Sequence, residues 1–147
     1  MYRKEHANPY LFHADSPAGG YDAIGVRYIM NDLYLRYGLP QFIVENGMSA
    51  RETMTGDEPI HDTYRIEYMR DHFTYMKQGV EDGVELWGYC CWAPIDLVSQ
   101  SLGEMEKRYG MVYVDLDNNG NGTNRRVPKD SFYWYKKVIA SNGEDLQ

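Results

Sequence analysis

Apolar side chains recur at three- and four-residue steps in three segments of the chain, a spacing that predicts amphipathic helices. The predicted helices run from Asp22 to Tyr37, from Asp62 to about Gln78, and onward from Asp130. Asp22 is the expected N-cap of the first helix, and Gly38 and Gly79 are expected to end the first two. The predicted buried stripes are, in chain order, Val26, Ile29, Leu33 and Tyr37; Ile66, Met69, Phe73 and Met76; and Phe132, Tyr135, Val138 and Ile139.

Two short runs are continuously apolar, as expected of strands that are buried on both faces of a parallel sheet. The first is Gln41 to Glu45, and the second is Val84 to about Trp92, where Pro94 breaks the pattern. A strand, a helix and a second strand form a βαβ unit, so the two strands should be parallel. Their carboxyl ends then meet at one edge, which predicts that Glu45 and Trp92 lie side by side.

The remaining segments are polar or irregular. Residues 1–21 show no periodic pattern, residues 48–59 form a long polar loop directly after the first strand, and residues 99–108 form another. A short alternating strand, Tyr109 to Asp115, is predicted to return as a hairpin through Arg125 to Pro128. The fold class is therefore α/β, but two strands and three helices cannot close an eight-stranded barrel.

Composition narrows the function classes. The 147 residues suit one globular domain, with 43% hydrophobic and 25% charged residues. A net charge of −7 argues against a nucleic-acid partner, which would require a basic face. No apolar run approaches the roughly 20 residues of a membrane span, and no apolar segment follows the basic start, so we expect a cytoplasmic protein without a membrane partner. Cys90 and Cys91 are expected to be reduced core residues.

The charge at the end of the first apolar strand has two interpretations. Glu45 could pair with a neighbouring arginine, or it could be a catalytic carboxylate, because active sites of parallel-strand barrels gather at the carboxyl ends of the strands. The sequence predicts no metal site. His61 and His72 are eleven residues apart and do not share a helix face, and the calcium-like run from Asp115 to Gly120 has Arg126 where the loop needs a glutamate. That run is expected to be a hairpin tip.

Several longer motifs share one pattern. They are Phe-Ile-Val-Glu45-Asn-Gly, Asp62-x-x-Arg65-Ile-x-Tyr68-x-x-x-His72, Gly88-Tyr-x-x-Trp92-x-x-x-Asp96, Lys107-Arg-Tyr-Gly-Met-Val-Tyr-Val-Asp115 and Lys129-Asp-Ser-Phe-x-Trp-Tyr135. Together they resemble glycoside hydrolase family 1, the β-glucosidase family, from about Asn8 to Asp145. The resemblance implies that residues 1–147 are a C-terminal fragment of a (β/α)8 TIM barrel. The fragment would comprise strands seven and eight, their helices and a closing hairpin, and would be incomplete on its own.

The loop after the second strand refines this resemblance. Family members that act on plain β-glucosides usually carry Asp-Asn-Phe-Glu-Trp here, whereas this chain has Ser99 and Gln100 in place of the Glu and Trp. Losing a carboxylate and gaining hydroxyls and a lysine suits a phosphate dianion on the sugar 6-position. The chain thus resembles the 6-phospho-β-glucosidase branch, with Ser101, Lys107 and Tyr109 as phosphate ligands and Ser99 as the alternative serine. The loss of the tryptophan at Gln100 favours gluco over galacto substrates.

The resemblance implies retaining hydrolysis of a phosphorylated sugar substrate without a cofactor. Glu45 would be the nucleophile, and Trp92 would line the sugar subsite. Outside this context, Lys107 and Arg108 are typical of a solvated loop pair. The family's acid/base segment, Thr-x-Asn-Glu-Pro, is not found in the sequence, so the chain alone is expected to be inactive. The alternative is a non-catalytic phosphosugar-binding or interaction module. Its open strand edges would require self-association or the rest of a barrel.

Overall fold

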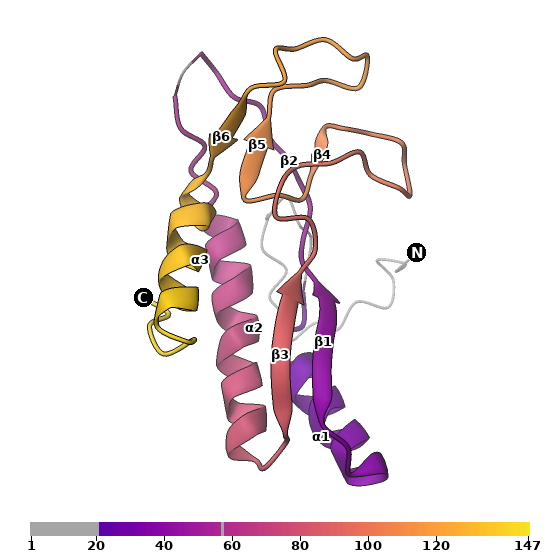
Figure 1. Cartoon of the computed structure of the whole chain (residues 1–147). Helices are drawn as coiled ribbons and strands as arrows, with labels where there is room; N and C mark the ends of the chain where they lie inside the picture. Colours follow the sequence, from indigo (N-terminus) through magenta and orange to yellow (C-terminus); the bar gives the residue numbers. More distant parts are fainter. Residues whose placement is uncertain (1–20, 57) are drawn as a thin grey trace.

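The computed structural model describes residues 21–56 and 58–147, so nearly all of the irregular segment predicted at residues 1–21 lies outside it. The described residues form an α/β arrangement (Figure 1). The elements are α1 (Ile24–Tyr37), β1 (Gln41–Asn46), β2 (Ala50–Arg51), α2 (Thr63–Glu81), β3 (Leu86–Cys91), β4 (Lys107–Arg108), β5 (Val112–Val114), β6 (Arg126–Pro128) and α3 (Asp130–Ala140).

Strands β1 and β3, which precede and follow α2 in the sequence, pair in parallel, and this confirms the predicted βαβ unit. Ile43 lies opposite Tyr89, and Asn46 lies opposite Cys91. The Trp92 amide donates a hydrogen bond of 2.8 Å to the Asn46 carbonyl, so the two carboxyl ends do lie side by side. The short pairs β2–β4 and β5–β6 lie beyond these ends, as Figure 1 shows.

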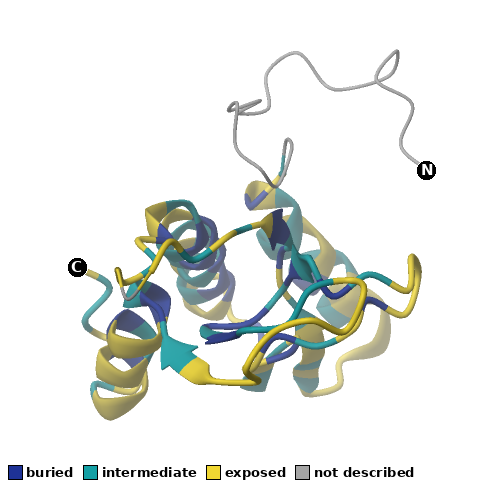
Figure 2. Cartoon of the chain, turned by 90° about the horizontal axis from the view of Figure 1, so that it is seen from above, coloured by how far each residue is buried: buried dark blue, intermediate teal, exposed yellow. Residues whose placement is uncertain are grey.

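The expectation that both strands are buried on two faces is wrong. Phe42 is 51% exposed and Val44 is 76% exposed, while Ile43 packs against the cluster of Met30, Met76 and Val84. Only one face of the two-stranded sheet is therefore covered by helices. Figure 2 marks exposed residues in yellow, and they also occur along the helices and loops. The continuous apolar run marks strands that need a second covering layer, which the described residues do not supply. Nor do these residues close a barrel.

The cysteines follow the same exposure pattern. Both thiols are free, but Cys90 is exposed and Cys91 is half-buried, so the prediction that both are core residues is wrong for Cys90. Alternation along a strand places Cys90 on the same face as Gly88, which is packed against the Phe42 ring on the uncovered side. Cys90 is therefore exposed for the same reason as Phe42.

The buried face of α1 also differs from the prediction. Ile29, Leu33 and Tyr37 are 45%, 39% and 67% exposed, whereas Met30 is only 2% exposed. A Cβ atom at Gly79 would lie 2.9 Å from the Met30 Cε atom, so the absence of a side chain at Gly79 lets α1 approach α2 closely. Gly79 does not end α2, which continues to Glu81. The Gly38 prediction is confirmed, because Gly38 has φ of +60° and donates to the Tyr34 carbonyl.

Helix α3 begins at Asp130 as predicted, but its buried face is shifted. Trp134 and Val138 are buried, whereas Phe132 and Ile139 are 38% and 62% exposed. The reason is that α3 packs on α2 and β6 with one side only, so a narrow apolar stripe is enough to bury that side. Of the four residues predicted to be buried on α3, Val138 is the one that the structure buries.

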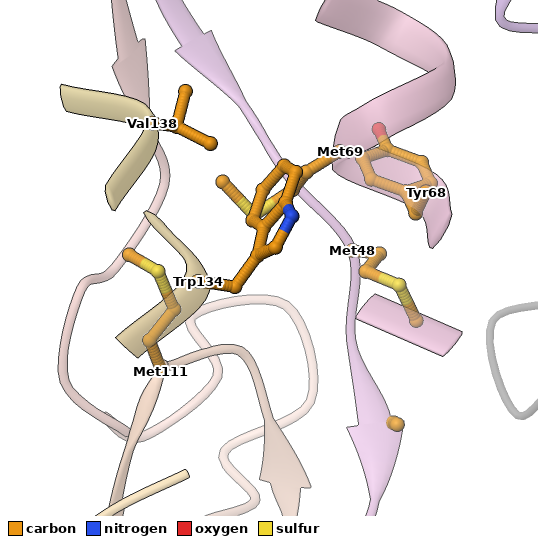
Figure 3. Packing of buried hydrophobic residues seen from close by; sticks show 7 residues of the cluster. Met48, Tyr68, Met69, Met111, Trp134 and Val138 are labelled. Carbon is orange, nitrogen blue, oxygen red and sulfur yellow. The ribbon is translucent and has the colours of Figure 1, made fainter. Parts of the chain in front are cut away.

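The main core cluster lies at the level of the carboxyl ends of the sheet and joins four parts of the chain (Figure 3). Met48 comes from the loop after β1, Met69 from α2, Met111 from the segment before β5, and Trp134 from α3. The Arg70 guanidinium stacks over the Trp134 ring at 5.8 Å. This packing fixes the loops at the carboxyl ends of β1 and β3 against α2 and α3.

The hairpin β5–β6 is antiparallel as predicted, with Tyr113 opposite Val127. At its tip, the Asp117 carboxylate accepts hydrogen bonds from the amides of Asn119 and Asn121, both 2.8 Å long. This is an ordinary Asx-type turn, in agreement with the hairpin-tip interpretation of the calcium-like run. No helix among residues 21–56 and 58–147 is long and apolar enough to cross a bilayer.

Candidate functional site

The three predicted phosphate ligands, Ser101, Lys107 and Tyr109, converge with the alternative serine, Ser99, in one cluster (the phosphate cluster). The Ser99 hydroxyl lies 3.2 Å from that of Ser101 and 3.3 Å from the Tyr109 phenol. The Lys107 ammonium donates to the Ser101 hydroxyl at 3.5 Å and lies 5.2 Å from the centre of the Tyr109 ring. Ser99 is fully buried, whereas Ser101 is exposed. One cation and three hydroxyls thus lie together, a donor set that suits an oxyanion.

The electrostatics of this cluster also favour an anion. Burial alone would raise the pKa of the Tyr109 phenol, but hydrogen bonds with Lys107 and Ser99, together with the lysine charge, hold its pKa below the ordinary value. Two nearby carboxylates are engaged elsewhere. Glu104 accepts from the Arg51 guanidinium at 2.6 Å, and Glu106 does so at 3.5 Å.

Trp92 borders the cluster. Its ring lies 6.4 Å from the Tyr109 ring, centre to centre, and the two planes are nearly perpendicular at 87°. The next residue, Ala93, has φ of +55°, a backbone conformation that is costly for any residue with a Cβ atom. The chain bends here after β3, and the Trp92 side chain is partly exposed.

Glu45 is exposed at the carboxyl end of β1. Among the described residues no lysine or arginine forms an ion pair with it, so the strand-end ion pair is not observed there. The next residue is held firmly. The Asn46 amide donates to the Tyr68 hydroxyl at 3.2 Å and accepts from the Tyr89 hydroxyl at 3.0 Å. Gly47 follows, and a Cβ atom there would lie 3.3 Å from that of Trp92, so the two strand ends are close.

A network of buried charges lies beside the site, and the sequence analysis did not predict it. Its six side chains are at most 5% exposed and carry three positive and three negative charges: Arg65, Arg108, Lys129, Glu52, Asp62 and Asp96. Charged side chains are usually expected at the surface, so residue type alone does not predict this network. One signal was present, because Arg65 lies four residues before Met69 and therefore on the buried side of α2.

The network fixes both ends of the loop that carries the phosphate cluster. The Lys129 ammonium contacts the Glu52 carboxylate and lies 3.2 Å from Asp96. Asp96 in turn accepts from the Gly110 amide at 2.7 Å. A Cβ atom at Gly110 would lie 2.3 Å from the Asp96 nitrogen, so only glycine allows this approach. The residues flanking the loop, Asp96 and Gly110, are thereby joined directly.

The two histidines of the described part of the chain, His61 and His72, make contacts within the fold. His72 is buried, stacks on Tyr68 with ring centres 4.1 Å apart, and has Nδ1 2.7 Å from the Tyr68 carbonyl oxygen. His61 is exposed and lies 2.7 Å from the Asp130 carboxylate. No group of three or more potential metal ligands occurs in the described part of the chain.

Burial lowers the pKa of His72 from its ordinary value of 6.5. Because the unfolded chain takes up this proton at a higher pH than the folded chain, the free energy of unfolding should fall as the pH drops below about 6.5. Urea unfolding at about pH 7.5 and about pH 5.5 measures this decline. The His72→Gln variant should show a smaller decline than the unchanged protein.

His61 provides a control of opposite sign. Its hydrogen bond to Asp130 raises the pKa of its imidazole, so its contribution is present at low pH and is lost as the pH rises through the folded-state value. His61→Gln should therefore steepen the decline toward low pH. An unchanged slope in His72→Gln would contradict the assignment of the acid-side loss to His72.

Comparisons with known proteins show what the chain is similar to. The family model "Glycosyl hydrolase family 1" matches residues 2–144. The 6-phospho-beta-glucosidase AscB of Escherichia coli is 52% identical over 98% of this chain and 30% of its own length, and the phospho-cellobiase of Klebsiella oxytoca is 53% identical over 86% and 27%. A solved family 1 β-glucosidase from Thermotoga maritima, in complex with isofagomine lactam, superposes with a TM-score of 0.75. It is 32% identical, and the match covers 84% of this chain and 27% of that chain. The chain thus spans about 30% of the length of the first of these relatives.

Proposed function

Since this chain belongs to glycosyl hydrolase family 1, we propose that it serves in the hydrolysis of 6-phospho-β-glucosides by a retaining mechanism. The observation that carries the proposal is the convergence of Ser99, Ser101, Lys107 and Tyr109 beside Trp92. Two relatives named for phosphorylated β-glucoside or cellobiose chemistry support the same substrate class.

Each side chain has a role in this proposal. Lys107 supplies the charge for the phosphate, and Tyr109 and Ser101 donate hydroxyls to it. Ser101 is the better of the two serine candidates, because it is exposed and lies next to Lys107, whereas Ser99 is fully buried and braces its neighbours. Trp92 offers an aromatic face to the sugar ring.

The chemical step requires two carboxyl groups about 5 Å apart. Glu45 attacks the anomeric carbon as the leaving-group oxygen is protonated by a second carboxylic acid, and water then hydrolyses the glycosyl-enzyme. This mechanism needs no metal or organic cofactor. We assign β1 and β3 to strands seven and eight of a (β/α)8 barrel and place the acid/base residue on a part of the barrel outside this chain. The chain alone should therefore not turn over substrate.

A chimera tests the proposal. This chain would replace the matched segment of the Escherichia coli relative, and hydrolysis of p-nitrophenyl β-glucoside would be compared with that of its 6-phosphate. We expect the chimera to prefer the phosphorylated substrate and the chain alone to be inactive. A preference for the unphosphorylated substrate would contradict the substrate class. Turnover by the chain alone would contradict the placement of the acid/base residue.

Replacing Lys107 by methionine should weaken binding of glucose 6-phosphate to the chain. A hydrogen bond to a charged group contributes about 1.5–3 kcal/mol, so we expect an affinity loss of roughly 10- to 100-fold by isothermal titration calorimetry. Lys136→Met makes the same change at an exposed position on α3 and should have no effect. Equal affinities for the Lys107→Met and Lys136→Met variants would remove Lys107 from the phosphate site.

A second candidate function is non-catalytic binding of a phosphosugar. It is favoured by the fact that the whole phosphate cluster lies within Ser99 to Tyr109 and is braced by groups of this same chain. In that case self-association, or association with the rest of a barrel, would cover the open face that carries Phe42 and Val44. Three results together would favour this candidate: a discrete dimer by light scattering, binding of glucose 6-phosphate by that dimer, and an inactive chimera.

A further inference from the structure

One buried side chain joins the two halves of the candidate site. Arg65 on α2 is 2% exposed, and its Nη1 atom donates to two main-chain carbonyl oxygens, that of Met48 at 3.1 Å and that of Tyr109 at 2.9 Å. Nη1 carries two hydrogens, so each carbonyl can receive one. The other side of the guanidinium is also engaged, with Glu52 at 2.6 Å and Asp62 at 2.9 Å.

The two carbonyls belong to different parts of the site. Met48 follows Glu45 by three residues, in the loop that leaves β1. Tyr109 is a member of the phosphate cluster and comes from the loop after β3. The single Nη1 atom is therefore a direct link between the loop that follows Glu45 and the phosphate cluster.

The rest of the network makes this link stiff. Glu52 and Asp62 fix the orientation of the planar guanidinium, and Asp62 is itself fixed by the Ser131 amide and hydroxyl at 2.9 Å and 2.6 Å. Glu52 is also bound by Lys129 and by the Tyr64 hydroxyl. A planar fork with several occupied donors cannot slide along either loop without breaking hydrogen bonds in a dry environment.

We propose that Arg65 is a positioning residue that sets the spacing between the nucleophile strand and the phosphate cluster, and that it thereby selects a sugar whose phosphate lies on the 6-position. The inference rests on the proposed function, since it assumes that Lys107 and Tyr109 receive the phosphate. Inorganic phosphate needs only the cluster itself. Glucose 6-phosphate must also fit its ring between the cluster and the end of β1, so its binding depends on the spacing.

The test compares two ligands on the whole chain by isothermal titration calorimetry. The unchanged protein should bind glucose 6-phosphate roughly tenfold more tightly than inorganic phosphate, as expected when about 1.4 kcal/mol of ring contacts is added. Arg65→Lys keeps the charge but cannot hold four acceptors in one plane. It should bring this ratio close to one and leave the affinity for inorganic phosphate within about twofold.

Arg70→Lys is the matched control. It makes the same change on the same helix, where the guanidinium donates to the Leu146 carbonyl at 2.7 Å and stacks on the Trp134 ring. The hydrogen bond that it makes is to the C-terminal segment, not to either loop of the site. Its affinity ratio should equal that of the unchanged protein. A purely structural role for Arg65 would lower both affinities together, and that outcome overturns the inference. An unchanged ratio in Arg65→Lys, or a ratio of one in the unchanged protein, also overturns it.

Failure of the proposed function has a different signature. If the unchanged chain binds neither ligand, or if Lys107→Met binds both as well as the unchanged chain does, the phosphate site itself is wrong and the inference falls with it. Should Arg65→Lys fail to fold, methyl NMR of the unchanged protein decides. Saturating glucose 6-phosphate, whose ring must fit between the cluster and the end of β1, should shift the Met48 methyl signal and leave that of Met30, in the other core cluster, in place. An unmoved Met48 signal overturns the proposal.

Discussion

Replacing Glu45 by glutamine in the chimera should reduce kcat for the chromogenic 6-phospho-β-glucoside by about 10⁴-fold or more, the scale seen when a covalent nucleophile is removed. Glutamine matches glutamate in size, so packing at the end of β1 should persist. Its neutral amide is a poor nucleophile toward the anomeric carbon and does not form the glycosyl-enzyme ester. Steady-state kinetics on the purified chimera measures the effect.

The control uses the same change at the opposite end of the sheet. Glu85 lies just before β3, at its amino end, and accepts a hydrogen bond from the Trp87 indole at 2.8 Å, which a glutamine oxygen can also accept. Glu85→Gln should leave kcat within about twofold. If Glu45→Gln retained more than about a tenth of the activity, Glu45 would be excluded as the nucleophile.

Replacing Lys129 by methionine should lower the free energy of unfolding by about 3–5 kcal/mol, the usual cost of removing one partner from a buried ion pair. Lys129 is fully buried between two carboxylates, Glu52 and Asp96. Burial already raises the pKa of Asp96, and the Lys129 charge opposes that rise. Without the ammonium, Glu52 and Asp96 must share the interior with less compensation, or Asp96 must take up a proton. Urea unfolding of the 147-residue chain measures the loss.

Lys137→Met separates this effect from the general loss of a lysine. Lys137 lies on α3 with its side chain 44% exposed, and it forms a solvent-exposed pair with Asp145, so its replacement should cost less than about 1 kcal/mol. Removing the Asp96 charge, which Lys129→Met leaves without its closest cation, should recover part of the lost stability. Lys129→Met combined with Asp96→Asn should be more stable than Lys129→Met alone. A single variant as stable as Lys137→Met would show that the network contributes little.

Local signals predicted most of the elements. The three helices, the parallel pair and the closing hairpin depend on side-chain periodicity and on turn residues such as Gly38, which act within a few residues of the chain. The proximity of the two strand ends at Asn46 and Trp92 also followed, because a βαβ crossover allows only one arrangement. The candidate phosphate cluster was named residue by residue from a family resemblance, and its side chains do meet.

Burial was harder to predict, because it depends on what covers each element. Ile29 and Leu33 look like core residues by periodicity but are exposed, since α1 meets α2 through Met30. Lys129 looks like a surface residue by type but is fully buried, because carboxylates distant in sequence surround it. Both facts are properties of long-range contacts, which periodicity in a single chain does not encode.

The phosphate cluster occupies one uninterrupted stretch, Ser99 to Tyr109, whereas Glu45 lies on a separate strand. Under the proposed function, substrate choice and bond cleavage are therefore encoded in different segments of the chain. Substitutions confined to residues 99–109 could then add or remove a preference for phosphorylated sugars during evolution, while the strand that bears Glu45 stays unchanged.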